Sequence, residues 1–281
     1  MRSFNGLFDG FRRTTALVSF MLRLCLNERI FSAFFVLSLL FISVINIVYV
    51  DGFQKALASQ MSELQYAFTT WHELASHMGV SAATIFMVLI ISVAFLPVLQ
   101  YALRKDMMFL VLSKPVRLSA YITAMFWAFV KALFILVAVW WLFVTVTVTM
   151  HGGKVVIDLF HSFACVFAFG CMNLAIFFLL FSVFRNALAS VFTLLLSASS
   201  VIMSDVKLLA DIKGAMTGVW ATMFPFAQWV ISSFGDWISL AFQPNLGIDR
   251  GSLLVRTLII IFGCMAMAIW NLRRQIQAER F

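Results

Sequence analysis

Residues able to do acid–base or metal chemistry are few in this sequence, and their spacings do not fit a metal or haem site. His72 and His77 are five residues apart, whereas two metal ligands on one face of a helix are spaced by four. His151 and His161 lie near the ends of apolar runs, whereas paired haem ligands would face each other at membrane depth. We therefore predict neither a metal site nor a cofactor in this chain.

The short motifs of hydrolases and nucleotide-binding enzymes are also missing from the sequence. It holds no GxSxG elbow, no HExxH pair and no GxxxxGK[ST] loop, and the GGK run at 152–154 lacks the first glycine of such a loop. The cysteines form no CxxC pair and are predicted to be small core residues: Cys25, Cys165, Cys171 and Cys264. The chain is not predicted to be an enzyme.

Two residues inside apolar runs are candidates for a transport route, Lys131 and Asn173. A charge inside a membrane is costly and often functional, but a lysine can also extend its ammonium group to the interface. An asparagine can line a route or join two helices by hydrogen bonds. Both interpretations stay open for each residue, whereas Arg256, near the start of the last apolar run, is predicted to anchor that run at the interface.

The composition explains why polar chemistry is so sparse. Hydrophobic residues make up 63% of the chain and charged residues 11%, whereas a soluble domain has about 45–50% and about 25%. The net charge of +8 is spread among the apolar runs and is not gathered on one polar face, so no nucleic-acid partner is predicted. The chain is instead predicted to be an integral membrane protein.

Six segments are long and apolar enough for the helices of such a protein, because a helix crosses the hydrocarbon layer with about 20 mostly apolar residues. They are 30–50, 82–103, 121–150, 159–184, 187–203 and 253–270. The fourth and fifth are separated only by Arg185 and Asn186, which predicts a tight turn. The predicted fold class is all-α, with six transmembrane helices in one domain over residues 1–281.

The distribution of charge predicts how these helices are oriented. Lys and Arg are enriched in loops that stay in the cytoplasm, and here they gather before the first run, between the second and third, and after the last. Acidic residues outnumber basic ones in the connections on the opposite side. Both termini are therefore predicted to be cytoplasmic, which requires an even number of spans. The pattern fits a bacterial inner membrane.

Three further segments have distinct predictions. Residues 1–29 form a cytoplasmic elbow, whose amphipathic part at 14–29 either lies flat against membrane lipids or extends the first span inward. Residues 51–80 form one or two short external helices. Residues 204–252 are rich in Trp and Phe but interrupted by Pro225 and Gly235. A re-entrant helix and an interfacial helix both fit this pattern, and an extra pair of spans is a third alternative.

The connection at 103–120 mixes charged residues with an apolar cluster. A solvated loop would not need this cluster, which consists of Met107, Met108, Phe109, Leu110 and Leu112. A short helix here would stop at Lys114 and Pro115, because the residue before a proline disfavours the α conformation. The apolar side of that helix needs a cover, either the membrane or a partner protein.

The end of this connection resembles a stretch between spans two and three in the permease subunits of ATP-binding-cassette exporters of the six-helix, type-two class. Those permeases have L-L-S-x-P-V-S-R-x-x-Y, and residues 110–121 here read LVLSKPVRLSAY. The departures are Lys114, where a small residue or Arg is common, and Arg117-Leu118, where Ser-Arg is usual. The flat N-terminal helix and the segment before the last span are also similar to that class.

The resemblance implies a function. A pair of permeases, identical or different, would work with two separate ATPase subunits, which bind ATP and Mg²⁺. A coupling helix from Arg104 to Leu112 would insert in a cleft of the ATPase, and ATP binding would switch the membrane dimer between two states. The implied ATPase-coupling residues are Arg104, Lys105, Asp106, Met107, Met108, Phe109, Leu110, Leu112, Lys114, Pro115 and Arg117.

The alternative function is that of a membrane scaffold subunit without transport. An intramembrane enzyme is disfavoured by the shortage of acids and bases inside the predicted spans.

Overall fold

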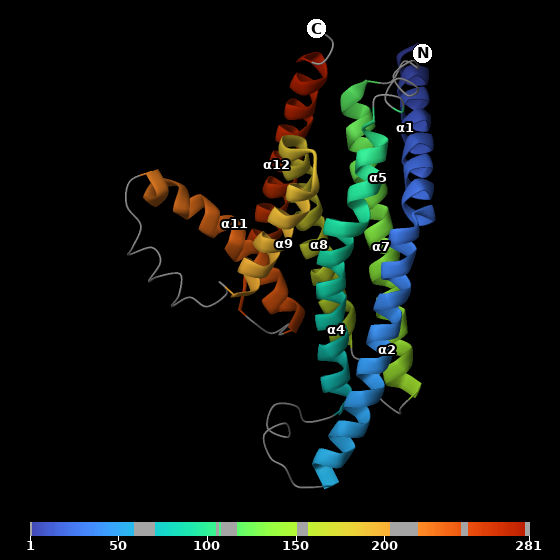
Figure 1. The fold of residues 1–281 in the computed structure, drawn as a ribbon, viewed down its shortest axis with the longest axis vertical. Helices are drawn as coiled ribbons and strands as arrows, with labels where there is room; N and C mark the ends of the chain where they lie inside the picture. Colours follow the sequence, from blue (N-terminus) through green and yellow to red (C-terminus); the bar gives the residue numbers. More distant parts are fainter. Residues whose placement is uncertain are drawn as a thin grey trace.

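The described part of the chain is almost entirely helical. The structure is a computed structural model that describes residues 2–58, 71–104, 107, 117–150, 157–202, 219–242 and 247–278, and these ranges contain no strand. The helices (Figure 1) are α1 (Arg2–Asn27), α2 (Arg29–Ala58), α4 (Trp71–Leu89), η1 (Ile90–Ala94), α5 (Phe95–Ala102), α7 (Leu118–Met150), α8 (Ile157–Phe184), α9 (Ala187–Ile202), α11 (Val219–Phe242) and α12 (Arg250–Ala278). The predicted all-α class is confirmed.

Several helices of the described part could cross a membrane. Four are long and apolar enough by themselves: Met78–Ala102, Leu118–Thr149, Leu159–Phe184 and Arg250–Gln275. The bent pair Thr15–Asn27 and Arg29–Val44 adds a fifth if both parts belong to one span, whereas the apolar helix Ala187–Ala198 is shorter. The protein is therefore an all-α protein with four to five candidate spans, and the sixth span stays a prediction.

The outer surface of the bundle is apolar. Large side chains such as Phe262, Phe160 and Phe134 are 68%, 64% and 61% exposed. Contiguous apolar surface is unfavourable in water, whereas a bilayer solvates it, and helices satisfy their own backbone hydrogen bonds in lipid. This surface therefore supports membrane embedding independently of helix length.

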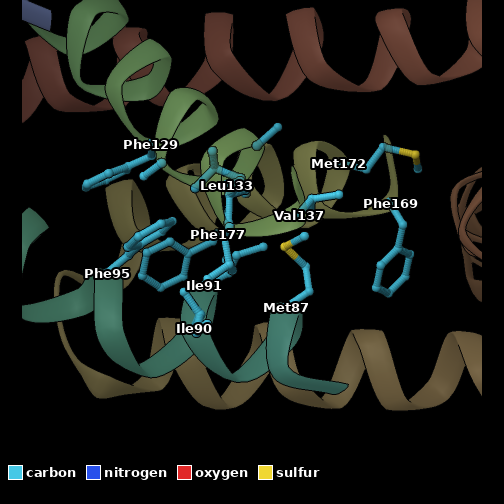
Figure 2. Packing of buried hydrophobic residues seen from close by; sticks show 14 of the residues in the cluster. Met87, Ile90, Ile91, Phe95, Phe129, Leu133, Val137, Phe169, Met172 and Phe177 are labelled. Carbon is cyan, nitrogen blue, oxygen red and sulfur yellow. The ribbon is translucent and has the colours of Figure 1, made fainter. Parts of the chain in front are cut away.

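Aromatic rings hold the centre of the bundle together (Figure 2). Phe95 of α5 stacks on Phe129 of α7 with ring centroids 4.4 Å apart, and on Phe31 of α2 with centroids 5.9 Å apart. Phe129 also meets Phe178 of α8 edge to face at 5.5 Å. Such pairs add specific geometry to simple burial, so this layer fixes four helices relative to one another.

Helices α8 and α12 run in the same direction. Near their ends, the Asn271 side-chain amide donates to the Ser182 hydroxyl at 3.3 Å, and the Gln275 amide donates to the Ser182 carbonyl at 2.9 Å. Earlier in both helices, the Thr257 hydroxyl contacts the Met172 sulfur at 3.5 Å. The chain between α8 and α12 must therefore travel back along the bundle, and α9 begins that return.

The predicted tight turn between α8 and α9 is present. Arg185 has a φ of 52°, which is unusual for a residue with a side chain. Its N–H donates to the Phe181 carbonyl at 2.9 Å, and the Asn186 side-chain oxygen accepts from the Leu188 N–H at 3.0 Å. These bonds satisfy backbone groups at the ends of both helices.

Four chain segments meet at one end of the bundle. Helix α1 begins there and α12 ends there, and α5 ends and α7 begins at the same end (Figure 1). The connection between α5 and α7 therefore starts and finishes beside the two terminal helices.

Most of the predicted elbow region forms one helix, α1. Helix α1 meets α2 at a bend of 65°, and the Ser32 hydroxyl donates across the bend to the Leu26 carbonyl at 3.3 Å. Helix α1 packs chiefly on α7 and buries Val18, Met21 and Cys25. A flat orientation of this helix at a membrane surface stays a prediction.

The second predicted span contains a break that the sequence did not predict. Between α4 and α5, the N–H of Phe95 donates to the carbonyl of Ile90, five residues earlier, which makes η1 a π-helical turn. Pro97 follows in α5 and has no N–H to donate. The hydroxyl of Ser92, inside η1, is buried without a hydrogen-bond partner among the described residues. Turns of this kind occur often at functional sites.

Two predicted connections differ from the structure. Helix α2 continues to Ala58 and α4 already begins at Trp71, so residues 51–58 and 71–80 continue the helices of the predicted spans, whereas residues 59–70 lie outside the described residues. The predicted interruptions at Pro225 and Gly235 are wrong, because α11 is continuous through both. Pro225 lies in the second turn and removes one backbone hydrogen bond, and packing of α11 on α8 and α9 outweighs the low helix propensity of both residues.

Candidate functional site

Of the predicted ATPase-coupling residues, Arg104 follows α5 and Arg117 precedes α7, at the bundle end described above. Arg104 and Arg117 are exposed, and Met107 is half-buried. The other predicted members lie outside the described residues: Lys105, Asp106, Met108, Phe109, Leu110, Leu112, Lys114 and Pro115. The structure thus places both ends of the connection at a solvent-accessible surface beside the start of α1.

A buried hydrogen bond closes the base of this connection. Tyr121, in the first turn of α7, is fully buried, and its hydroxyl donates to the carbonyl of Ala102, the last residue of α5, at 2.7 Å. This bond satisfies a carbonyl that the helix end leaves without an internal partner. The Tyr121 N–H also donates to the Arg117 carbonyl at 3.1 Å. The ends of two candidate spans are therefore tied together at the point where the connection leaves them.

Lys131, the first predicted pathway residue, lies on the outer face of α7. Its side chain is exposed, and its helical neighbours Trp127 and Phe134 are 51% and 61% exposed. No described residue forms an ion pair or hydrogen bond with it. The structure therefore places Lys131 on the surface that faces the surroundings of the bundle.

Asn173, the second predicted pathway residue, is fully buried between α8 and α9. Its amide donates to the Phe169 carbonyl at 3.0 Å, and its side-chain oxygen accepts from the Ser197 hydroxyl at 2.5 Å. Asn173 thus joins the two helices, and the structure does not bring it together with Lys131.

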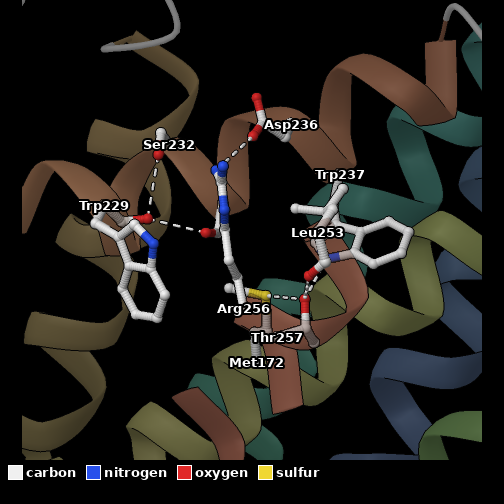
Figure 3. A network of polar contacts seen from close by, with 9 residues as sticks. Met172, Trp229, Ser232, Asp236, Trp237, Leu253, Arg256 and Thr257 are labelled. Carbon is white, nitrogen blue, oxygen red and sulfur yellow. Dashed lines mark hydrogen bonds and ion pairs between the residues drawn. The ribbon is translucent and has the colours of Figure 1, made fainter. Parts of the chain in front are cut away.

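A polar cluster joins α11 to the start of α12 (Figure 3). The Trp237 indole donates to the Thr257 hydroxyl at 2.7 Å, and that hydroxyl donates to the Leu253 carbonyl at 2.8 Å. Arg256 and Asp236 form an ion pair at 3.7 Å. Desolvation raises the pKa of the Asp236 carboxyl, and the positive charge of Arg256 opposes that rise. The predicted interfacial anchor Arg256 therefore also holds α11 against α12.

The described residues offer no assembled metal centre. No three His, Cys, Asp or Glu side chains gather there as metal ligands. The four cysteines are all buried and free of disulfides, and Cys165 contacts the ring of His161, one turn earlier on the same helix, at 3.5 Å. Several polar side chains of the bundle join helices to one another, among them Trp140, Ser197 and Trp237.

Sequence patterns did not reveal the contacts of Tyr121, Trp237 and Asp236. Each pairs with a residue on another helix about 20 positions away, so no helical spacing rule relates the partners. The only signal was indirect: Tyr121 closes the stretch that resembles the exporter permeases.

Comparisons with family models and with curated protein sequences identify no relative of this chain. No family model matches the chain, and no curated protein sequence matches it. What the protein does must therefore be inferred from its own residues and geometry.

Proposed function

We propose that this protein is the membrane permease subunit of an ATP-driven exporter of the type-two ATP-binding-cassette class. In this proposal the connection between α5 and α7 engages a separate ATPase subunit, and a second permease completes the membrane unit. The ATPase binds ATP and Mg²⁺, and this chain converts the nucleotide cycle into movement of its helices.

The observation that carries this proposal is the Tyr121 hydrogen bond to Ala102 at the base of the connection. Because the bond ties the end of α5 to the start of α7, a force on the connection acts on both helices together. The π-helical turn η1 separates α5 from α4, so α5 has a break about which it can reorient. This arrangement would transmit a movement of the ATPase through the connection to α5 and α7.

We further propose six spans, with α9 as the fifth and both termini in the cytoplasm. Helices α8 and α12 are parallel, so the chain between them must return across the bundle once, and α9 is the apolar helix that begins this return. An even number of crossings then brings the start of α1 and the end of α12 to one side. This side holds the basic connection between α5 and α7, which is the cytoplasmic side by the charge rule.

The function is tested by purifying the full chain from its native membranes and identifying its partners. We expect an ATPase with a Walker motif to co-purify with the unmodified chain. Replacing both Phe109→Asp and Leu110→Asp should abolish this association, because charged side chains cannot occupy an apolar cleft. The control pair Phe109→Leu and Leu110→Met keeps apolar side chains and should retain the ATPase.

The alternative scaffold function gives a different result in the same experiment. If the Asp pair leaves ATPase association unchanged, or no ATPase accompanies the unmodified chain, the coupling role of this connection is wrong. Loss of the ATPase with both pairs would show general damage to the protein, which size-exclusion profiles of the two variants would reveal.

A further inference from the structure

The bend between α1 and α2 leaves an apolar groove against α7. The groove has a volume of about 220 Å³ and is lined by side chains of all three helices, among them Leu26, Phe35 and Ile135. Its one polar lining residue is Ser32, whose hydroxyl already donates to the Leu26 carbonyl. The groove therefore offers its occupant an apolar surface.

Basic residues lie within one turn of this groove on two helices. Arg29 is three residues before Ser32 on α2, and Lys131 is four residues before Ile135 on α7, so each shares a helix face with a lining residue. Both side chains are exposed, and neither has an ion-pair or hydrogen-bond partner among the described residues. Arg23 adds a third exposed cation near the bend, against one half-buried acid, Glu28.

Helix α7 is long enough for Lys131 to reach a headgroup layer. Its 33 residues span about 50 Å, whereas the hydrocarbon layer is about 30 Å thick, and a lysine side chain can extend its ammonium group to the interface. Lys131 follows Leu118, the first residue of α7, by 13 positions (131 − 118), which is about 20 Å along a helix. Its neighbours Trp127 and Phe134 are large exposed apolar side chains, as expected on a lipid-facing surface. A cation at such a site is stabilised by an anion that can itself reside in the bilayer.

We propose that the groove is a binding site for one anionic phospholipid of the surrounding membrane. An acyl chain of this lipid lies along Leu26, Phe35 and Ile135, and its phosphate pairs with Lys131 and Arg29. The lipid thereby covers the open side of the bend between α1 and α2. The proposal requires only that the chain is embedded in a membrane, and it does not depend on the transporter assignment.

The test uses the full chain in phosphatidylcholine vesicles that contain a minority of photoactivatable phosphatidylglycerol. After illumination, labelled peptides are identified by mass spectrometry and compared with those from photoactivatable phosphatidylcholine. We expect phosphatidylglycerol to label the peptides around Leu26 and Ile135 preferentially. Lys131→Gln should reduce this labelling about fivefold, the effect expected for one basic residue near an anionic lipid, and Lys131→Arg should restore it.

Two further variants separate a specific site from general attraction. Arg273→Gln removes an exposed cation from α12 and should leave labelling of the groove unchanged. Ile135→Trp fills the groove from its exposed side and should reduce labelling while the positive charges remain. Equal labelling by the two lipids, or equal losses in Lys131→Gln and Arg273→Gln, would overturn the proposal.

Discussion

Some polar side chains inside this bundle make contacts that join neighbouring helices. The Trp140 indole of α7 donates to the Ser38 hydroxyl of α2 at 2.8 Å, and Asn173 and Ser197 link α8 to α9. In a membrane such hydrogen bonds contribute about 0.6 kcal/mol on average, so they fix helix positions more than they supply stability. The Tyr121 bond differs because it ties together the two ends of one connection.

The substitution Tyr121→Phe should destabilise the protein, although it keeps the aromatic ring in the core. The change removes the donor to Ala102 and leaves a buried carbonyl unsatisfied, which costs about 1–3 kcal/mol. We expect the free energy of unfolding in detergent micelles, measured with a denaturant, to fall by that amount.

Tyr101→Phe is the matched control for this change. It deletes the same hydroxyl from the adjacent helix α5, at a side chain that is 45% exposed, and should leave the free energy of unfolding unaltered. Equal effects of the two substitutions would show that the bond to Ala102 does not hold α5 to α7.

At the residue scale, the sequence predicted those features that form a local pattern along the chain. The apolar cluster at 103–120 was evident because a solvated loop does not need it, and the cysteines were correctly placed in the core. The partners of Tyr121, Trp237 and Asp236 were not predicted, because they depend on how separate helices pack. Asn173 has a structural contact, and the pathway role of both Asn173 and Lys131 stays a prediction.

At the scale of elements, two candidate spans are interrupted at the same level of the bundle. The bend of 65° separates α1 from α2, and η1 separates α4 from α5. Phe31, just after the first break, stacks on Phe95, just after the second. These two rings connect the two breaks, so movement of the helices at one break would displace the helices at the other.

Close packing of α4 against α8 depends on a glycine. A Cβ atom added at Gly170 would lie 2.8 Å from the sulfur of Met87, a residue of the central core (Figure 2). Gly170→Leu should therefore force these helices apart and cost about 1–3 kcal/mol. We expect a lower thermal unfolding midpoint in detergent.

Gly263→Leu provides the comparison for this substitution. Gly263 lies on the exposed face of α12 with no atom within 4 Å of an added Cβ, so the larger side chain should be tolerated to within about 0.5 kcal/mol. If both leucine variants unfold at the same temperature, α4 and α8 do not approach as closely as described.

Helix positions followed from the sequence because a bilayer demands long apolar segments. Each predicted span coincides with a helix or a pair of helices. Helix breaks were harder to predict, since α11 is continuous through Pro225 and Gly235 whereas the π-helical turn η1 precedes Pro97. In α11, packing against neighbouring helices outweighs local propensity.

At the scale of the whole molecule, the proposed function requires a bundle that places its basic connection and both terminal helices on one side. The start of α1, the end of α12 and the ends of the connection between α5 and α7 lie at one end of the bundle (Figure 1). The opposite end holds the start of α12, which follows the exposed Gly247. This layout is what an ATPase on the cytoplasmic side requires.

Accessibility labelling of single cysteines tests this layout most directly. The four native cysteines are buried, so a membrane-impermeant thiol reagent should react mainly with cysteines introduced as Lys114→Cys, Arg280→Cys or Gly247→Cys. In intact cells and inverted vesicles, we expect positions 114 and 280 to react only from the cytoplasmic side and position 247 only from the outside. Reaction of positions 114 and 280 from opposite sides would contradict the layout and the transporter assignment built on it.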